Sequence, residues 1–292
     1  MRPEDRLSYA APFDHPQRSA PGGAAVMVWP VVNVENWLID NPMPRQVLVA
    51  PTGAVLKPDL ANWGWHEYGM RVGFWRLHEA FARRGLKPTL SINGSVCDAY
   101  PRLAGAAHDS GGEFMGHGFV QVPTHLVEDQ RRMIADTVER IRTFTGRPCE
   151  GWLGPGLTET LETPDLLAEA GVRYVADWVV DDTPCRLPTR AGDLVTMPYT
   201  LELNDIAINM IQYHGHDELR LRAQRTVDRL AREARASGRP RVMCFAVHCY
   251  ITGVPHRIDS FEAMLDSLMA RDDVIFMQGR DILRWHMETN SV

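Results

Sequence analysis

The sequence predicts an α/β fold in which seven or eight parallel strands form an irregular (β/α) barrel. Short apolar runs alternate with longer amphipathic segments along most of the chain. These runs are apolar at nearly every position, which is typical of parallel strands whose outer face is covered by helices. The chain has 292 residues, a length that suits one large α/β domain.

The N-terminal part differs from the rest in composition. Residues 1–23 are rich in Pro, Gly and polar residues, so we expect an irregular arm that could pack on a partner subunit. The run 24–35 is apolar almost throughout and predicts the first strand. The barrel domain is therefore predicted to occupy residues 24–292.

The later elements follow from the same two patterns. Short apolar runs predict further strands at 87–92, 113–117, 149–154, 172–178, 193–200, 241–248 and 274–278. Helical patterns predict helices at 70–85, 126–146, 163–171, 217–238, 260–270 and 281–286. Gly85 and Gly146 end two of them, as glycine commonly does after a last helical turn. The strongly charged helix 217–238 is expected to expose one face to solvent.

Charge and cysteine content exclude several classes of protein. The net charge of −6 argues against a nucleic-acid partner or an anionic membrane surface. No apolar run approaches the roughly 20 residues that span a bilayer. The first residues carry charges of both signs and no apolar core, unlike a signal peptide. The five cysteines are scattered without a C-x-x-C motif, so we expect reduced thiols in a cytoplasmic protein.

Polar residues at strand ends indicate where chemistry takes place. In a (β/α) barrel the carboxyl ends of the strands meet at one mouth. Such residues are Glu35, His117 and His248, together with the segment 178–182 and the pair Asn204 and Asp205. They come from distant parts of the chain, and a barrel would bring them together. This convergence predicts an active site.

Three of these residues are candidates for catalysis. A partly desolvated Glu35 could act as a general base near neutral pH, the alternative being a surface glutamate. His117 and His248 could donate a proton or stabilise developing charge, or could be hydrogen-bonded core histidines. His125 lies at a predicted helix start, where it is more often an ordinary helix residue than a metal ligand.

Other patterns are weaker. Arg71 near the mouth could hold a carboxylate or carbonyl oxygen, or could be structural. Asp182, with Asp181 before Thr183-Pro184, also fits a simple turn. The sequence has no P-loop, G-x-G-x-x-G, H-E-x-x-H or G-x-S-x-G motif, which argues against the chemistries that use them.

Six stretches carry a resemblance to a known family. They are EYGMRVGFWRL (67–77), GHG (116–118), RTFTGRPCEGW (142–152), DWVVDDTP (177–184), MPYTLELND (197–205) and FAVHCYITGVPHR (245–257). With them, residues 24–288 resemble the polysaccharide deacetylase superfamily, also called NodB-homology or carbohydrate esterase family 4. The chain looks most like its cofactor-independent allantoinases and cyclic imide hydrolases. The resemblance implies an irregular (β/α) barrel.

The departures from the family pattern bear on the metal. Deacetylases of the superfamily use an Asp-Asp pair, where this chain has Glu35 and Asn36, and two histidines four apart, where it has His117 and Gln121. Leu153 stands at a position where they carry arginine. Neutral amide oxygens are poor zinc ligands, so we expect no metal cofactor. The remaining zinc hypothesis would use Glu35, His117 and His125.

The resemblance implies hydrolysis of a C–N bond in a small cyclic amide, imide or ureide. Glu35 would activate water, while His117 and His248 would stabilise the oxyanion or protonate the leaving nitrogen. Asn204 and Asp205 could recognise ring N–H and C=O groups. The side chains expected to form flat apolar walls against the ring are Trp152, Trp178 and Tyr199.

Two rival functions remain open from the sequence. One is a zinc-dependent N-deacetylase of an N-acetylated sugar or peptidoglycan fragment. The other is a non-catalytic binding protein on a degraded barrel. The family resemblance also suggests a homo-oligomer, either a dimer or a tetramer.

Overall fold

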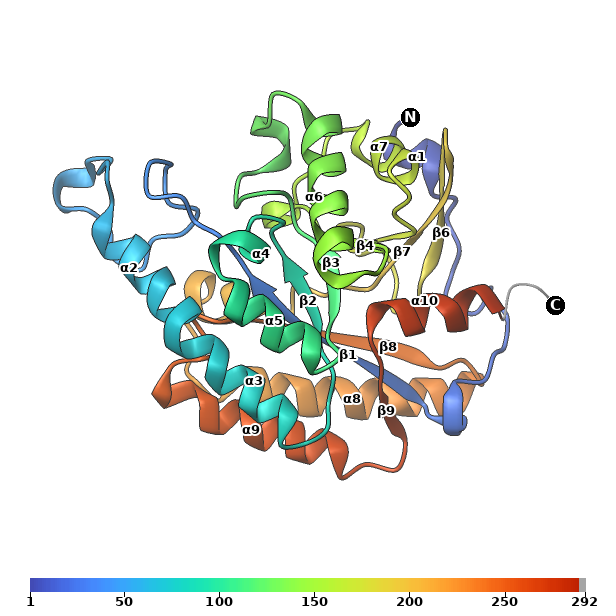
Figure 1. The fold of residues 1–292 in the computed structure, drawn as a ribbon. Coiled ribbons are helices and arrows are strands. Elements are labelled where there is room, and N and C mark those ends of the chain that lie inside the picture. Colours follow the sequence, from blue (N-terminus) through green and yellow to red (C-terminus); the bar gives the residue numbers. More distant parts are fainter. Residues whose placement is uncertain (289–292) are drawn as a thin grey trace.

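The computed structural model describes residues 1–288, so the last four residues of the predicted 24–292 domain lie outside the described part. The fold is α/β, with a mostly parallel sheet that curls into a half-barrel, as predicted (Figure 1). In these residues the sheet has nine strands in the order β6-β7-β5-β4-β3-β2-β1-β8, and β9 pairs with β1. The strands are β1 (Val26–Val34), β2 (Thr89–Ile92), β3 (Glu113–Gly116), β4 (Gly151–Trp152), β5 (Tyr174–Val175), β6 (Cys185–Thr189), β7 (Gly192–Thr196), β8 (Arg241–His248) and β9 (Val274–Phe276).

Every strand pairing in the described sheet is parallel except that between β6 and β7. The sequence did not predict β6, which pairs antiparallel with β7 at the edge of the sheet. This strand contains Pro188, a residue that cannot donate to a strand ladder and is therefore tolerated mainly at an edge. An apolar run alone does not reveal such a strand.

Helices surround the sheet; most of them lie on its outer face, whereas the last one packs Ile282, Leu283 and Trp285 against the inner core. They are α1 (Pro3–Arg6), α2 (Leu60–Tyr68), α3 (Phe74–Ala82), α4 (Val96–Ala99), α5 (Pro101–Asp109), α6 (Gln130–Thr145), α7 (Thr163–Glu169), α8 (Glu218–Ser237), α9 (Pro255–Met269) and α10 (Gly279–Glu288). Two π-helices, η3 (Gly69–Gly73) and η6 (Ile206–Ile211), interrupt this pattern. The predicted helix 70–85 is thus η3 followed by α3. Helices α3, α5, α8 and α9 pack on β1, β2 and β8, while α6 and α7 cover β4, β5 and β7.

Alternation along the long strands decides which side chains enter the barrel. In β1, Met27, Trp29 and Val31 belong to the inner core, whereas Val28 and Val32 pack outward. In β8, Cys244 and Ala246 face inward, whereas Phe245, Val247 and Cys249 pack outward. Because successive side chains in a strand point to opposite faces, His248 at the end of β8 and Glu35 directly after β1 continue the inward rows.

The segment that contains Leu203 and Asn204 packs along the edge of β8 that does not pair with β1. The backbone N–H of Ala246 donates to Leu203 O at 2.9 Å, and Asn204 forms a parallel bridge with Ala246. This contact narrows the open side of the half-barrel. It also places Asp205 beside His248.

The N-terminal arm packs on its own barrel. Arg6 is buried and forms an ion pair with Asp165 at 2.8 Å. Further along, His15 contacts Asp181 at 2.8 Å, and the indole N–H of Trp285 donates to Ser19 O at 2.9 Å. Contact of this arm with a neighbouring subunit stays a prediction. None of the helices within residues 1–288 has the combination of length and apolar character needed to cross a membrane.

Candidate active site

Glu35 lies at the centre of a buried polar cluster at the carboxyl end of β1. Only 3% of its surface is exposed. Its Oε2 accepts hydrogen bonds from Trp37 Nε1 at 2.6 Å and from the Tyr250 hydroxyl at 3.1 Å. Its Oε1 accepts from Gln121 Nε2 at 3.1 Å. The carboxylate therefore has a fixed orientation, with Oε1 turned toward two histidines.

His248 ends β8 and is oriented by Asp205. Its Nδ1 donates to Asp205 Oδ1 at 2.6 Å, and its backbone N–H donates to Oδ2 at 2.7 Å. The hydroxyl of Thr252 also donates to Oδ2, at 2.7 Å. Because a carboxylate only accepts, Nδ1 carries the proton and Nε2 points toward Glu35 Oε1, 3.6 Å away. This is the arrangement in which a carboxylate orients an imidazole for proton transfer.

His117 follows β3 and approaches the same carboxylate oxygen. Its Nδ1 donates to the backbone carbonyl of Leu153 at 2.6 Å, which fixes the ring and its tautomer. Its Nε2 lies 3.9 Å from Glu35 Oε1. Three side chains from three separate strand ends thus direct Oε1 and two Nε2 atoms into one small space, as the sequence predicted for these residues.

The electrostatics of the cluster differ from the sequence-based expectation for Glu35. Burial favours the neutral acid, but the charges of His248 and His117 and the hydrogen bond from Trp37 outweigh it, so the pKa of Glu35 is lowered. Burial also lowers the pKa of His117, against the opposing effect of Glu35. Glu35 is therefore ionised and His117 neutral at neutral pH. The sequence argument had assumed a glutamate made more basic by desolvation.

The residues at the superfamily's metal positions do not fit a zinc ion. The Asn36 side chain donates to Ser95 Oγ at 2.9 Å, and its backbone N–H donates to Asn93 Oδ1 at 2.7 Å. Asn93 donates in turn to Gln121 Oε1 at 3.2 Å, which turns the Gln121 amide N–H group toward Glu35. A group that donates to the carboxylate cannot ligate a cation beside it.

The fallback set of Glu35, His117 and His125 is not assembled. His125 is exposed in η4 (Thr124–Leu126). In the part of the chain that the structure describes, no group of three or more His, Cys, Asp or Glu side chains has metal-binding geometry. We therefore derive no step through a metal.

Of the three side chains predicted to form walls against a bound ring, Trp152 and Tyr199 are engaged elsewhere in the protein. Trp152 is fully buried outside the barrel, in a core cluster with Ile134 and Leu167 of α6 and α7, which corrects its expected role. Its neighbour Leu153 points inward instead. Tyr199 lies inside the barrel, where its hydroxyl accepts from Asn33 and Asn204 rather than facing a ligand. Trp178 is half-buried after β5 and packs against the same outer core cluster as Trp152, so its role as a wall stays a prediction.

Two other predicted contacts are also revised. Asn204 and Asp205 are engaged with the protein itself, Asn204 with Tyr199 and the backbone of Ile206 and Asp205 with His248. Asp205 is thus a residue that orients His248 rather than one that recognises substrate.

Asp182 lies at the other end of β8, because its carbonyl accepts from Val242 N near the strand start. His248 lies six steps further along the strand than Val242, or about 20 Å away. Asp182 therefore does not reach the mouth. Arg71 is exposed on η3 beside Tyr100, and no described contact joins it to Glu35.

Sequence reasoning missed three residues that hold Glu35. They are Trp37, Tyr250 and His66, whose Nε2 contacts the carbonyl of Glu35 at 2.9 Å. His66 also stacks on Trp37 with ring centroids 4.6 Å apart. Trp37 and Tyr250 stand two positions after Glu35 and His248, so extending the inward alternation by one step beyond the strand ends would have found them.

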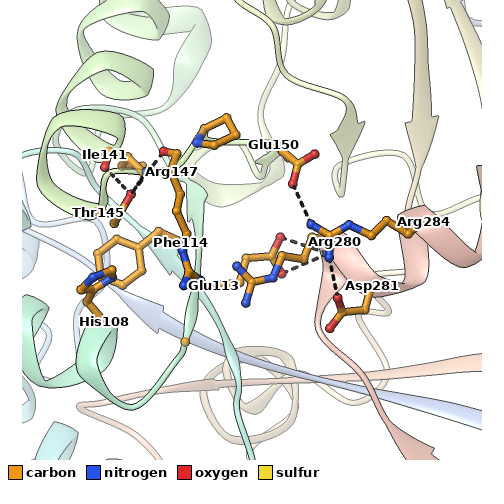
Figure 2. Close-up of a pocket in the computed structure, with 12 residues that line it drawn as sticks. His108, Glu113, Phe114, Ile141, Thr145, Arg147, Glu150, Arg280, Asp281 and Arg284 are labelled. Atoms are coloured by element: carbon orange, nitrogen blue, oxygen red, sulfur yellow. Dashed lines mark hydrogen bonds and ion pairs between the residues drawn. The ribbon is translucent and has the colours of Figure 1, made fainter.

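A separate hollow of about 430 Å³ lies around Glu113, at the start of β3 (Figure 2). The Glu113 carboxylate accepts from the Tyr174 hydroxyl and from Arg280 N, at 2.8 and 3.0 Å. Arg284 is paired with Asp281 at 3.2 Å. Because these groups are engaged with one another at the amino ends of the strands, we place the chemistry at the Glu35 cluster instead.

Comparisons with known proteins agree with this architecture. No protein-family model matches the chain. Among curated proteins, a Schizosaccharomyces pombe protein named as a polysaccharide deacetylase is 23% identical over 227 residues, covering 71% of this chain and 70% of that protein. A probable polysaccharide deacetylase from Pseudomonas aeruginosa PAO1 has a TM-score of 0.82 at 24% identity, covering 94% of this chain and 95% of that chain. The allantoinase PuuE has a TM-score of 0.83 at 19% identity, covering 98% and 100%.

The fold is therefore similar to the deformed (β/α) barrel of CE4 or NodB-like proteins. Its structural neighbours include both a deacetylase and an allantoinase. The comparisons accordingly do not distinguish between these branches.

Proposed function

We propose that the protein hydrolyses a C–N bond in a small cyclic amide, imide or ureide without a metal. The observation that carries this proposal is the convergence of Glu35 Oε1 with the Nε2 atoms of His248 and His117, at 3.6 and 3.9 Å, in a buried site. The likeness of the fold to an allantoinase supports the substrate class.

In the proposed mechanism, Glu35 is the general base. A water molecule held between Glu35 Oε1 and His117 Nε2 gives its proton to the carboxylate as its oxygen attacks the ring carbonyl carbon. His117 suits the role of acceptor because its Nδ1 proton is held by Leu153 O and its ring is neutral. The lowered pKa of Glu35 keeps the carboxylate ionised at neutral pH, although it also makes the group a weaker base.

His248 would act as the proton donor. Asp205 holds its Nδ1 proton and stabilises the imidazolium form. Nε2–H can then stabilise the oxyanion and protonate the ring nitrogen as the C–N bond breaks. The proton taken by Glu35 Oε1 then passes to His248 Nε2, 3.6 Å away, which restores the carboxylate and the imidazolium for the next cycle.

The zinc-dependent N-deacetylase remains the second candidate, because two relatives carry deacetylase names. The two functions differ in their need for metal. Hydantoin, succinimide, allantoin and N-acetylglucosamine oligomers should be assayed with chelator and with added zinc. We expect ring opening that chelator does not affect. Turnover of N-acetyl sugars only with zinc would overturn the proposal, and binding without any turnover would support the non-catalytic barrel.

A further inference from the structure

A pair of carboxyl groups lies beside the site and has no part in the mechanism above. Asp177 follows β5, and Glu159 follows the short helix η5 (Pro155–Leu157). The two side chains interact, and Glu159 Oε1 is a buried oxygen to which no N–H or O–H group of the described residues donates, so a hydrogen bond between the two carboxyl groups would satisfy it. Since a carboxylate can only accept hydrogen bonds, such a contact requires a proton on one of the two groups.

The pair contacts two elements of the candidate site. The backbone N–H of Gly154 donates to both oxygens of Asp177, at 2.9 and 2.8 Å. Gly154 directly follows Leu153, whose carbonyl accepts the Nδ1 proton of His117. On the other side, Trp178 Nε1 donates to Glu159 Oε2 at 2.8 Å.

The backbone oxygen of Thr158 leaves no room for a side chain at position 154. A Cβ on Gly154 would lie 2.4 Å from Thr158 O and 3.1 Å from Asp177 Oδ1. Contacts this short do not occur, so only glycine allows the amide of residue 154 to approach the carboxyl group. The turn that follows the His117 acceptor is therefore packed tightly against Thr158, and its Gly154 amide is held by Asp177.

Burial makes a proton on the pair stable at neutral pH. It raises the pKa of Glu159 to about 7. Burial and the negative charge of Glu159 raise the pKa of Asp177 well above its usual range. The charged group that acts on Glu159 from a packed element is Arg6 of α1, and its guanidinium is already paired with Asp165.

We propose that Glu159 and Asp177 form a proton-sharing positioning pair that fixes His117, through the Leu153–Gly154 backbone, and Trp178 directly. The inference rests on the proposed function for its catalytic consequence. Loss of the shared proton would set two carboxylates against each other, because the hydrogen bond between them cannot form without it. The Leu153–Gly154 turn and the Trp178 indole would then lose their common support.

The first test needs no substrate. An unfolded glutamate has its ordinary pKa of 4.5, whereas that of Glu159 is about 7 in the folded protein. Between these values the folded state binds more protons than the unfolded state, so its stability falls as pH rises. Glu159→Gln removes this titration. The difference in Tm between E159Q and wild type should therefore increase from pH 4.5 to 7. For the exposed control Glu162→Gln, the difference in Tm from wild type should stay constant over the same range. A constant difference for E159Q would overturn the shared proton.

The second test asks whether the pair positions the site. Asp177→Asn keeps an oxygen for Gly154 N–H and offers an amide donor to Glu159, so kcat should stay within about threefold of wild type. Asp177→Ala removes both contacts and should lower kcat at least about tenfold, as expected when a catalytic group is displaced. In the wild-type enzyme, loss of the shared proton should lower kcat/KM as the pH rises through about 7. In E159Q this decrease should be absent.

The outcomes separate the two proposals. Equal rates for D177N and D177A, or an unchanged pH profile in E159Q, would contradict the positioning role. If D177A does not fold, the comparison of E159Q with wild type still decides. If no variant and no wild-type protein hydrolyses any ring, the proposed function fails while the Tm test remains valid.

Discussion

Replacing Asp205 by asparagine tests how His248 is oriented. Asp205 accepts three hydrogen bonds, from His248 Nδ1 at 2.6 Å, His248 N at 2.7 Å and Thr252 Oγ1 at 2.7 Å. Asparagine has one acceptor oxygen and one N–H group in their place. In either amide orientation, one N–H of His248 faces another donor. The Thr252 hydroxyl can rotate to accept, but His248 cannot adapt at both positions.

The structure sets the size of both effects. At least one hydrogen bond to a charged acceptor is lost in a fully buried place, which should lower the free energy of unfolding by about 1.5–3 kcal/mol. If the amide N–H group faces Nδ1, that nitrogen must be unprotonated, so the ring can no longer form the imidazolium that acts as the proton donor. We expect kcat to fall by about 10²–10⁴, the range for general acid–base catalysis.

The assay is kcat and KM on the best ring found, with urea unfolding in parallel. Thr252→Val is the matched control, since it removes one hydrogen bond to Asp205 and leaves both bonds to His248 in place. It should cost about 1 kcal/mol of stability and lower kcat less than about tenfold. A D205N enzyme that keeps more than about a third of the wild-type kcat would refute the orientation of His248 by Asp205.

Three further predictions concern the same site. Activity should survive prolonged chelation, and stoichiometric zinc whose removal abolishes turnover would contradict this. Cys249→Ser should stay within about tenfold of wild type, because Cys249 packs in the outer core; inactivation of a folded variant would indicate a thiol nucleophile. Trp37→Phe removes a hydrogen bond that lowers the Glu35 pKa, so the acidic limb of kcat/KM should move to higher pH, and an unmoved limb would exclude this contact as a cause.

Strand alternation explains why some site residues could be predicted. Glu35, His117 and His248 end inward rows of long or well-marked strands, and the (β/α) pattern brings those ends together. The same rule gives the wrong side for Trp152 in β4. This strand has only two residues, so the sequence does not show that Trp152 points outward. A strand this short has too few residues for the alternation to show which side chains face into the barrel.

Asp182 was misplaced for a different reason. The segment after β5 leaves the mouth and reaches the start of β8 before it forms the edge strand β6. That path depends on tertiary contacts with β8 and the N-terminal arm, among them the pair of His15 and Asp181. Nothing local in the turn residues encodes this direction, because an Asp pair before Thr-Pro fits a turn at either end of the barrel.

The most direct test of the central claim is the rate of Glu35→Gln in metal-free buffer. Gln is nearly isosteric and keeps an acceptor for Trp37 and Tyr250, but it cannot take the proton of water. The exposed His125→Gln is the control and should behave as wild type. We predict that kcat of E35Q falls by about 10²–10⁴ with a much smaller change in KM. An E35Q enzyme that retains more than about a third of the wild-type rate would show that Glu35 is not the base.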